Sequence, residues 1–288
     1  MRSISVDDCL NARVHVGHIS RRWNPRMKQY ILLEQNHRHV IDVRKTISAI
    51  ESSYKQLSEI VASGQKVLFV ATKKQFSDYV FKVASEVDMP YVTDRWLGGM
   101  LTNFVTIRRV VKKSGYLQKR IEDPQFCYLA KKEQAVLKRR KEKDDRKFCG
   151  IGNMFRLPGA VFVVDVKNEK TAVSEARGVG IPVFGIVDTN SDPTCVDFPI
   201  PANDDALESV TFIIDVLKDA IYEGMAIYNE SLKSAEGVHG SADGTGNMTK
   251  NANDRPKGSL QRENGGSNRS SRRVAYIKRG GSSTVGNK

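Results

Sequence analysis

The chain has 288 residues, 40% of them apolar, and its 46 Lys and Arg against 33 Asp and Glu give a formal net charge of +13. This length and composition predict one large domain or two small ones with a packed core, and exclude a chain that is disordered throughout. No apolar run approaches the roughly 18 residues of a membrane-spanning helix, no signal-peptide core begins the sequence, and the four cysteines are far apart, so we expect a cytoplasmic protein with reduced thiols.

Residues 1–29 are predicted to form an N-terminal arm. Within it, HISRRWNPRMKQY (His18–Tyr30) places several cations around one tryptophan and an Asn-Pro break. Cations interleaved with an aromatic ring suit contact with phosphates and stacking on a base or sugar. The alternative is that Trp23 anchors the arm on the core, and the two roles are compatible.

A β-hairpin is predicted next, because Tyr30–Val43 alternates in hydropathy on either side of Gln35–Arg38. A helix should follow, with Thr46 as its N-cap and Gly64 at its end.

A doubly wound parallel sheet is predicted for residues 30–106 and 149–236, which we expect to form one α/β domain. Three of its strand-like runs are almost wholly apolar, as in strands buried on both faces, and helix-like segments separate the runs. The predicted strands are Val67–Lys73, Pro90–Arg95, Ala160–Val166, Pro182–Thr189 and Phe198–Asn203.

The stretch RWLGGMLTNF (Arg95–Phe104) follows the second of these runs. A glycine pair at such a place allows the backbone to approach a phosphate, an RNA or another part of the same protein. A lone Gly-Gly is weak evidence for a phosphate site, and the packing of a close turn explains it at least as well.

Residues 107–148 are predicted to form a basic insertion in the sheet domain. Arg108–Lys147 contains 15 Lys or Arg against 6 Asp or Glu, a net charge of +9. Ile107, Val110, Ser114, Leu117 and Ile121 follow steps of three and four residues, which predicts a coiled-coil α-helical hairpin. A disordered linker is the alternative.

The segment 237–288 is predicted to be a disordered basic tail, because Gly, Ser and Asn dominate it. It carries 10 Lys or Arg against 3 Asp or Glu, so the rest of the chain outside this tail and the insertion is slightly acidic. Such segregation of charge indicates a polyanionic partner. The alternative is an ordinary solvated helix face followed by a charged tail.

The aspartates at the predicted strand ends (Asp165, Asp188, Asp192, Asp204 and Asp205) raise an enzymatic alternative. They suit a divalent cation or acid–base chemistry, although turns and helix caps explain them as well. Neither GxGxxG nor GxxxxGK[ST] follows the first strand, and no GxSxG is present. A nucleotide- or metal-dependent α/β enzyme is therefore the alternative function. A receiver-like signalling domain shares the fold, but the basic insertion is foreign to it.

Seven segments between Val6 and Gly224 resemble those of bacterial ribosomal protein S2 in content and order: HVGHISRRWNPRM, HVIDVRKT, VLFVATKK, RWLGGMLTNF, LPGAVFVVDV, GIPVFGIVDTNSDP and IPANDDA. The resemblance implies a flavodoxin-like (Rossmann-like) sheet with an inserted coiled-coil hairpin. It implies a non-enzymatic, ribosome-bound structural constituent of the small subunit that binds 16S rRNA, helps to dock ribosomal protein S1 and contacts neighbouring small-subunit proteins. Neither a membrane nor a homo-oligomer is expected.

The candidate RNA-binding residues lie in the arm, the glycine segment and the insertion. They are Arg21, Arg22, Trp23, Arg26, Lys28, Arg95, Asn103, Arg108, Arg109, Lys112, Lys113, Lys138, Arg139 and Arg140. The resemblance requires no cofactor, but it suggests a structural divalent cation, zinc or magnesium, at His18, Asp188 and Asp204 or Asp205. Arg13 stands where the family commonly has glycine, and the tail has no family counterpart.

Overall fold

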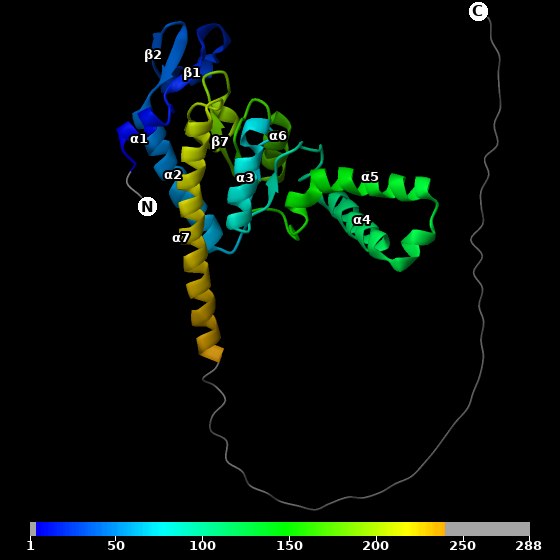
Figure 1. Cartoon of the computed structure of the whole chain (residues 1–288). Helices are drawn as coiled ribbons and strands as arrows, with labels where there is room; N and C mark the ends of the chain where they lie inside the picture. Colours follow the sequence, from blue (N-terminus) through cyan, green and yellow to red (C-terminus); the bar gives the residue numbers. More distant parts are fainter. Residues whose placement is uncertain (1–3, 240–288) are drawn as a thin grey trace, which may run out of the picture. The chain divides into compact units, whose positions relative to one another are not determined.

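The computed structural model describes residues 4–239, beginning with a short helix and a small antiparallel sheet (Figure 1). These elements are α1 (Val6–Asn11), β1 (Val16–Ile19), β2 (Ile31–Gln35) and β3 (Arg38–Ile41), with strand order β1-β3-β2. The predicted hairpin is β2–β3, and Asn36 and His37 turn the chain at φ 52° and 59°. These left-handed conformations match the twist of a two-residue hairpin turn. Strand β1, from the arm, was not predicted.

Helix α2 (Val43–Ala62) begins earlier than predicted, and the assignment of Thr46 as its N-cap is wrong. The cap is Asp42, whose carboxylate accepts a hydrogen bond from the Arg44 N–H at 3.1 Å. Thr46 lies one turn inside the helix, where its fully buried hydroxyl donates to the Pro201 carbonyl at 2.6 Å. A carboxylate at the helix start satisfies N–H groups and favours the helix dipole, so the helix extends to it.

Each of the five predicted runs contains a strand of one parallel sheet. The strands are β4 (Val67–Val70), β5 (Tyr91–Val92), β6 (Ala160–Val163), β7 (Val183–Val187) and β8 (Phe198–Pro201). Their order is β5-β4-β6-β7-β8, which is the 2-1-3-4-5 order of flavodoxin-like folds. Every residue of β4, β6 and β7 is buried, because helices cover both faces of the sheet. The predicted fold class is confirmed.

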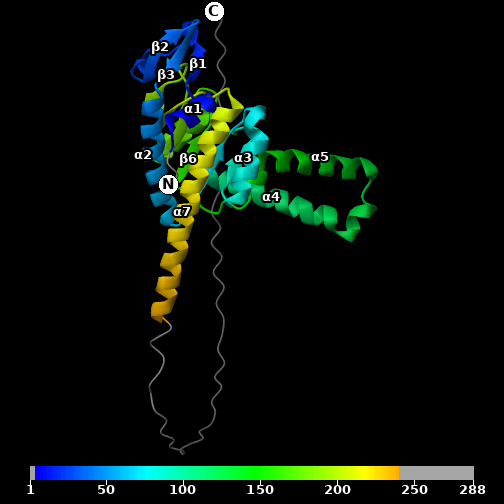
Figure 2. The same cartoon turned by 60° about the vertical axis from the view of Figure 1, so that its left-hand side comes forward.

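Two hydrophobic cores lie on the two faces of this sheet. On one face, Phe69, Phe162 and Phe184 pack with α2, α3 (Lys74–Glu86) and α7 (Leu207–His239). The views in Figures 1 and 2 show these three helices along that side. On the opposite face, the alternate residues of the same strands pack with α6 (Lys170–Val179) and the glycine segment. This alternation follows from the two-residue period of a strand.

The insertion consists of α4 (Phe104–Glu122), the short helix η3 (Pro124–Tyr128) and α5 (Lys131–Phe148). The two long helices run side by side away from the sheet in Figures 1 and 2. All five residues of the predicted seam are buried or half-buried, although most of their neighbours along α4 are exposed. The segment is thus helical, unlike a disordered linker. Its supercoiling and its domain boundaries stay predictions.

Helix α7 continues to His239, so residues 237–239 of the predicted disordered tail are helical. The helix-forming residues before Gly237 carry the helix across the predicted boundary. The remainder of that prediction lies outside the described residues. Among the helices of residues 4–239, none is both long enough and apolar enough to span a membrane.

Candidate nucleic-acid interface and carboxylate cluster

The arm is held on the sheet domain by its backbone and by Met27. The Asn24 N–H donates to the Thr189 carbonyl at 2.7 Å, and Met27 is fully buried. Trp23 keeps 37% of its surface exposed while its ring lies 5.3 Å from that of His39. One part of the Trp23 ring thus packs on the fold, and the other is open to solvent, so stacking on RNA stays a prediction.

The arm cations differ in their surroundings. Arg26 forms an ion pair with Asp192 and donates to the Thr194 hydroxyl at 3.0 Å. By contrast, Arg21, Arg22 and Lys28 are exposed and pair with no other residue of the described chain. These three cations can meet phosphates without breaking an existing contact.

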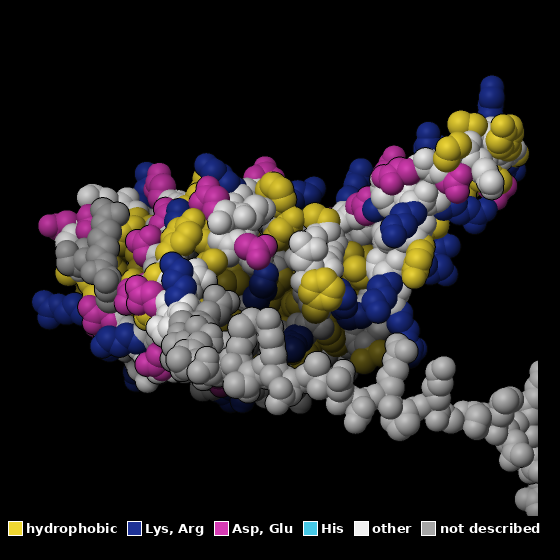
Figure 3. Space-filling view, turned by 90° about the horizontal axis from the view of Figure 1, so that it is seen from below, with side chains coloured by type: hydrophobic (Ala, Val, Ile, Leu, Met, Phe, Trp, Pro, Cys, Tyr) yellow, Lys and Arg dark blue, Asp and Glu magenta, His cyan; other side chains and the backbone are white. Residues whose placement is uncertain are grey.

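Most hairpin cations point into solvent without a partner, and Figure 3 shows Lys and Arg side chains along the projecting hairpin. Within residues 4–239, the following exposed cations have no ion pair: Arg109, Lys112, Lys113, Arg139 and Arg140. Lys138 lies 5.8 Å from the centre of the Phe126 ring. Arg108 is half-buried, donates to the Gly152 carbonyl at 3.1 Å and lies over the Phe155 ring, so it ties the hairpin base to a neighbouring loop.

The glycine segment wraps around a carboxylate of the same chain. Glu175, on the buried side of α6, accepts hydrogen bonds from the Trp96 indole at 3.1 Å and the Gly99 N–H at 2.7 Å. It also accepts the N–H groups of Leu101 at 3.1 Å and Thr102 at 3.4 Å. Gly99 has φ 88°, a left-handed conformation that suits glycine and turns these N–H groups toward one point.

Burial raises the pKa of Glu175, but the surrounding N–H donors outweigh it and hold the pKa below its ordinary value. The glycine pair thus brings the backbone to another part of the same protein. Arg95 and Asn103, at the two ends of the segment, are exposed. Sequence reasoning missed Glu175, although one signal was present: an acid beside Ala172, Val173 and Ala176 on an otherwise apolar helix face.

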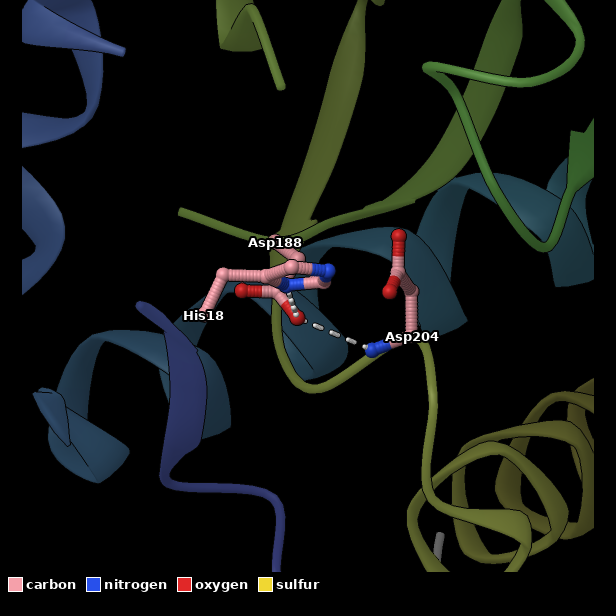
Figure 4. Close-up of side chains that lie close together, drawn as sticks. All are labelled: His18, Asp188 and Asp204. Atoms are coloured by element: carbon pink, nitrogen blue, oxygen red, sulfur yellow. Dashed lines mark hydrogen bonds and ion pairs between the residues drawn. The ribbon is translucent and has the colours of Figure 1, made fainter. Parts of the chain in front are cut away.

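A carboxylate cluster lies at the carboxyl ends of the strands (Figure 4). One ligand atom from each of His18, Asp188 and Asp204 lies within 4.8 Å of the others. The His18 Nδ1 atom is 2.9 Å from Asp188 Oδ2, and Nε2 is 3.2 Å from Asp205 Oδ2. Asp205 is largely exposed, so it lies at the rim of the cluster.

His18 reaches this cluster because β1 passes very close to the end of β7. A Cβ atom on Gly17 would lie 2.6 Å from Thr189 Cγ2, so a larger residue would push the strand away. The His18 N–H donates to the Thr189 hydroxyl at 2.9 Å, and that hydroxyl donates to Asp188 at 3.0 Å. The arm and the sheet are therefore joined at the predicted metal residues.

Lys73 is a central member of the cluster that sequence reasoning missed. Its Nζ atom is 2.8 Å from Asp165, 2.9 Å from Asp205 and 3.4 Å from Asp204. Burial lowers the pKa of Lys73, but these carboxylates outweigh it and raise the pKa above its ordinary value. The signal was its position three residues after the end of the first parallel strand, where the side chains of neighbouring strand ends meet.

Carboxyl groups outnumber cations in the cluster, with Asp165, Asp188, Asp204 and Asp205 around Lys73 and His18. Burial, and then the neighbouring Asp188 and Asp165, raise the pKa of Asp204 to about 8. The hydrogen bond to Asp188 raises the pKa of His18, although burial opposes it. The buried Asp204 Oδ1 atom accepts no hydrogen bond from the described residues. This set of one imidazole and two carboxylates fits a divalent cation.

Comparison with known proteins identifies the family of the chain. The family model described as ribosomal protein S2 matches residues 9–224. The chain belongs to this family.

Several relatives carry the name small ribosomal subunit protein uS2. The protein from Cytophaga hutchinsonii is 50% identical over 225 residues, which cover 78% of this chain and 89% of the relative. The protein from Bacteroides thetaiotaomicron is 49% identical, and the match covers 78% of this chain and 81% of the relative. The protein from Amoebophilus asiaticus is 44% identical, and the match covers 82% of this chain and 75% of the relative. As a member of the S2 family the chain is a structural ribosomal protein and not an enzyme, and the enzymatic alternative is not supported.

Proposed function

We propose that this S2-family chain is a structural constituent of the small ribosomal subunit, ribosome-bound in the cytoplasm, and that it binds 16S rRNA through its arm and hairpin. The observation that carries the proposal is the contrast in pairing among its charges. Lys73, at the carboxylate cluster, pairs with carboxylates, whereas Arg109, Lys112 and Arg139 on the net-positive hairpin are exposed and unpaired within the described chain.

Affinity for RNA would arise mainly when these cations replace the ions condensed on phosphates. The cations need no rearrangement to do so, because they make no contact that must first be broken. The hydrogen bonds that Glu175 accepts from Gly99 and Leu101 fix the segment that leads into α4, so the start of the hairpin is held rigidly on the sheet domain. The arm adds Arg21, Arg22 and the exposed part of Trp23.

A salt titration tests this proposal. The logarithm of the affinity for 16S rRNA should fall steeply with the logarithm of salt concentration, with a slope of about −0.7 to −0.9 per neutralised phosphate. Changing Arg109, Lys112 and Lys113 to Gln should flatten that slope by roughly 2 to 3. The matched control changes the exposed cations Lys55, Lys74 and Lys82 of α2 and α3 and should leave the slope unchanged. An affinity that barely depends on salt, or equal effects of both variants, would contradict the proposal.

A structural divalent cation at His18, Asp188 and Asp204 is a second part of the proposal. The buried Asp204 Oδ1 atom accepts no hydrogen bond from the described residues, and carboxyl groups outnumber cations around it, which supports the ion. An imidazole nitrogen among the ligands favours zinc over magnesium, which prefers oxygen ligands and water. Such an ion would neutralise the carboxylates and tie the arm to the sheet. Elemental analysis of protein purified without chelators tests this, and Asp204→Asn should lower the metal content.

Docking of ribosomal protein S1, and contacts with neighbouring small-subunit proteins, complete the proposal. They rest on the resemblance of the sequence segments to the family. The test is whether subunits that lack this chain also lose ribosomal protein S1 in a sucrose gradient, and whether adding the purified chain restores it.

A further inference from the structure

The tip of the hairpin carries an aromatic side chain that the fold does not use. Tyr128, the last residue of η3, is 90% exposed. Phe126, two residues earlier, is only 6% exposed and packs beneath Lys138. Figure 3 shows hydrophobic-class side chains, a class that includes Tyr, gathered at the outer end of the hairpin. One aromatic residue therefore anchors the tip while the other projects into solvent.

Hydrogen bonds hold the tip in this conformation. The Asp123 carboxylate accepts the Gln125 N–H at 2.8 Å and so caps η3 at its start. At the other end, the Gln134 side-chain amide donates to the Leu129 carbonyl at 2.9 Å and to that of Cys127 at 3.4 Å. Tyr128 is thus presented by a fixed backbone, and a partner would find the aromatic ring already in place.

Two lysines follow the exposed ring closely along the chain. Lys131 and Lys132 follow it in the first turn of α5, and both are exposed without an ion pair in the described chain. Cations in a first turn oppose the helix dipole, so they are unfavourable for the helix itself. An exposed aromatic ring beside unpaired lysines matches the surface that stacks on a base while neighbouring phosphates are neutralised.

We propose that Tyr128 is a base-stacking residue, which packs against an unpaired nucleobase of RNA while Lys131 and Lys132 contact the adjacent phosphates. This inference rests on the proposed rRNA binding and assigns the hairpin tip a role that differs from that of the hairpin sides. The sides would hold the backbone of RNA, whereas the tip would need a single-stranded or bulged nucleotide.

The test measures binding of the full chain to 16S rRNA at fixed salt. Tyr128→Ala should raise the dissociation constant about 10-fold, whereas Tyr128→Trp should keep near-normal affinity because it preserves the stacking face. The matched control is Tyr116→Ala, which removes a 71% exposed tyrosine from the side of α4 and should change the affinity less than about 2-fold. Circular dichroism checks that the variants fold.

Salt dependence separates the two contributions at the tip. Tyr128→Ala should weaken binding without changing the salt slope, because stacking releases no ions, while Lys131→Ala should flatten the slope by about 0.7 to 0.9. Ultraviolet cross-linking of the complex should join RNA to the peptide that contains Tyr128.

The outcomes distinguish failure of this inference from failure of the proposed function. If the unaltered chain does not bind 16S rRNA, the proposed function fails. If it binds, and Tyr128→Ala binds equally well, the stacking assignment is overturned alone. If Tyr128→Ala binds free rRNA normally but enters subunits poorly, the tip contacts a protein, which also overturns the assignment.

Discussion

The carboxylate cluster at the sheet edge and the helical hairpin hold their charged side chains in opposite surroundings. In the cluster, Lys73 lies among Asp165, Asp204 and Asp205, and Arg26 of the adjoining arm pairs with Asp192. On the hairpin, cations such as Lys112 and Arg139 are exposed and make no ion pair with another described residue. Charges satisfied inside a fold contribute to that fold. Unpaired cations repel one another, so a cluster of them favours binding of an anionic partner.

Glu175 lies at the boundary between the sheet domain and the hairpin. It belongs to α6 of the sheet domain, yet it accepts its hydrogen bonds from the segment that leads into α4. The connection between sheet domain and hairpin, which we call the joint, therefore consists of the Glu175 carboxylate and the N–H groups that donate hydrogen bonds to it. Phe148, at the end of α5, is buried in the core that also contains Trp96 and Leu101 of the glycine segment, and it fixes the other end of the insertion.

Removing the hairpin should have the largest effect on function. Deleting Arg108–Lys147 and joining the ends through a short glycine–asparagine linker should leave a folded sheet domain, because the core formed by α2, α3 and α7 contains no hairpin residue. The melting temperature should fall by a few degrees, because the deletion removes Val110 and Val111, which pack against the core on the opposite face of the sheet. Incorporation into small subunits, measured in sucrose gradients, should fall about 100-fold. Normal incorporation of a folded deletion variant would show that the hairpin is not the binding element.

Changing the joint should have the largest effect on stability. Glu175→Gln removes the charge and turns amide hydrogens toward N–H donors, so the free energy of unfolding should fall by about 3 kcal/mol. That loss corresponds to a drop of roughly 6–12 °C in melting temperature. The control, Glu34→Gln at an exposed position of β2, should change stability by less than about 0.5 kcal/mol. Equal effects of the two changes would mean that the hydrogen bonds to Glu175 do not stabilise the fold.

Acid titration tests the same joint through its pH dependence. The pKa of Glu175 lies below its ordinary value of 4.5, so the carboxylate contributes its full stability above about pH 4.5 and loses it as the pH falls through the folded-state pKa. The difference in stability between the unaltered chain and Glu175→Gln should therefore be largest near neutral pH and shrink in acid. Urea unfolding at a series of pH values measures it. A difference that grew in acid would have the wrong sign for this mechanism.

The sequence predicted the parts of the fold that depend on local pattern. The runs around Val67, Ala160 and Val183 are apolar at every position because helices cover both faces of the sheet, and this pattern is visible without knowledge of the partners. The exposed face of α4 and its seam follow from helical periodicity in the same way. Strand β1 escaped prediction because it is short and pairs only with β3, a partner that follows it along the chain.

The candidate site was predicted less completely, because its contacts join distant parts of the chain. His18, Asp188 and Asp204 were found through strand-end position and family resemblance, and the structure brings them together. Lys73 and Glu175 were missed, since their partners lie far away: Lys73 contacts Asp205 across 132 positions and Glu175 contacts Gly99 across 76. No local pattern encodes such pairs. The sequence suggested Trp23 as an anchor of the arm but not Met27, which is fully buried and also holds the arm on the sheet domain.

The smallest expected effect comes from comparing two arginines of the arm. Arg26 is paired with Asp192, so Arg26→Gln should lower the free energy of unfolding by about 0.5 kcal/mol, the scale of an exposed ion pair. Arg21 has no partner in the described chain, so Arg21→Gln should leave stability unchanged and instead flatten the salt dependence of rRNA binding by about 0.7 to 0.9. Arg26→Gln should flatten it less, because Asp192 already uses part of that charge. Urea unfolding and salt titration of both variants measure the two effects. Equal salt slopes for the two variants would show that pairing inside the fold does not decide which cations are available to RNA, and the contrast between carboxylate cluster and hairpin would then lose its functional meaning.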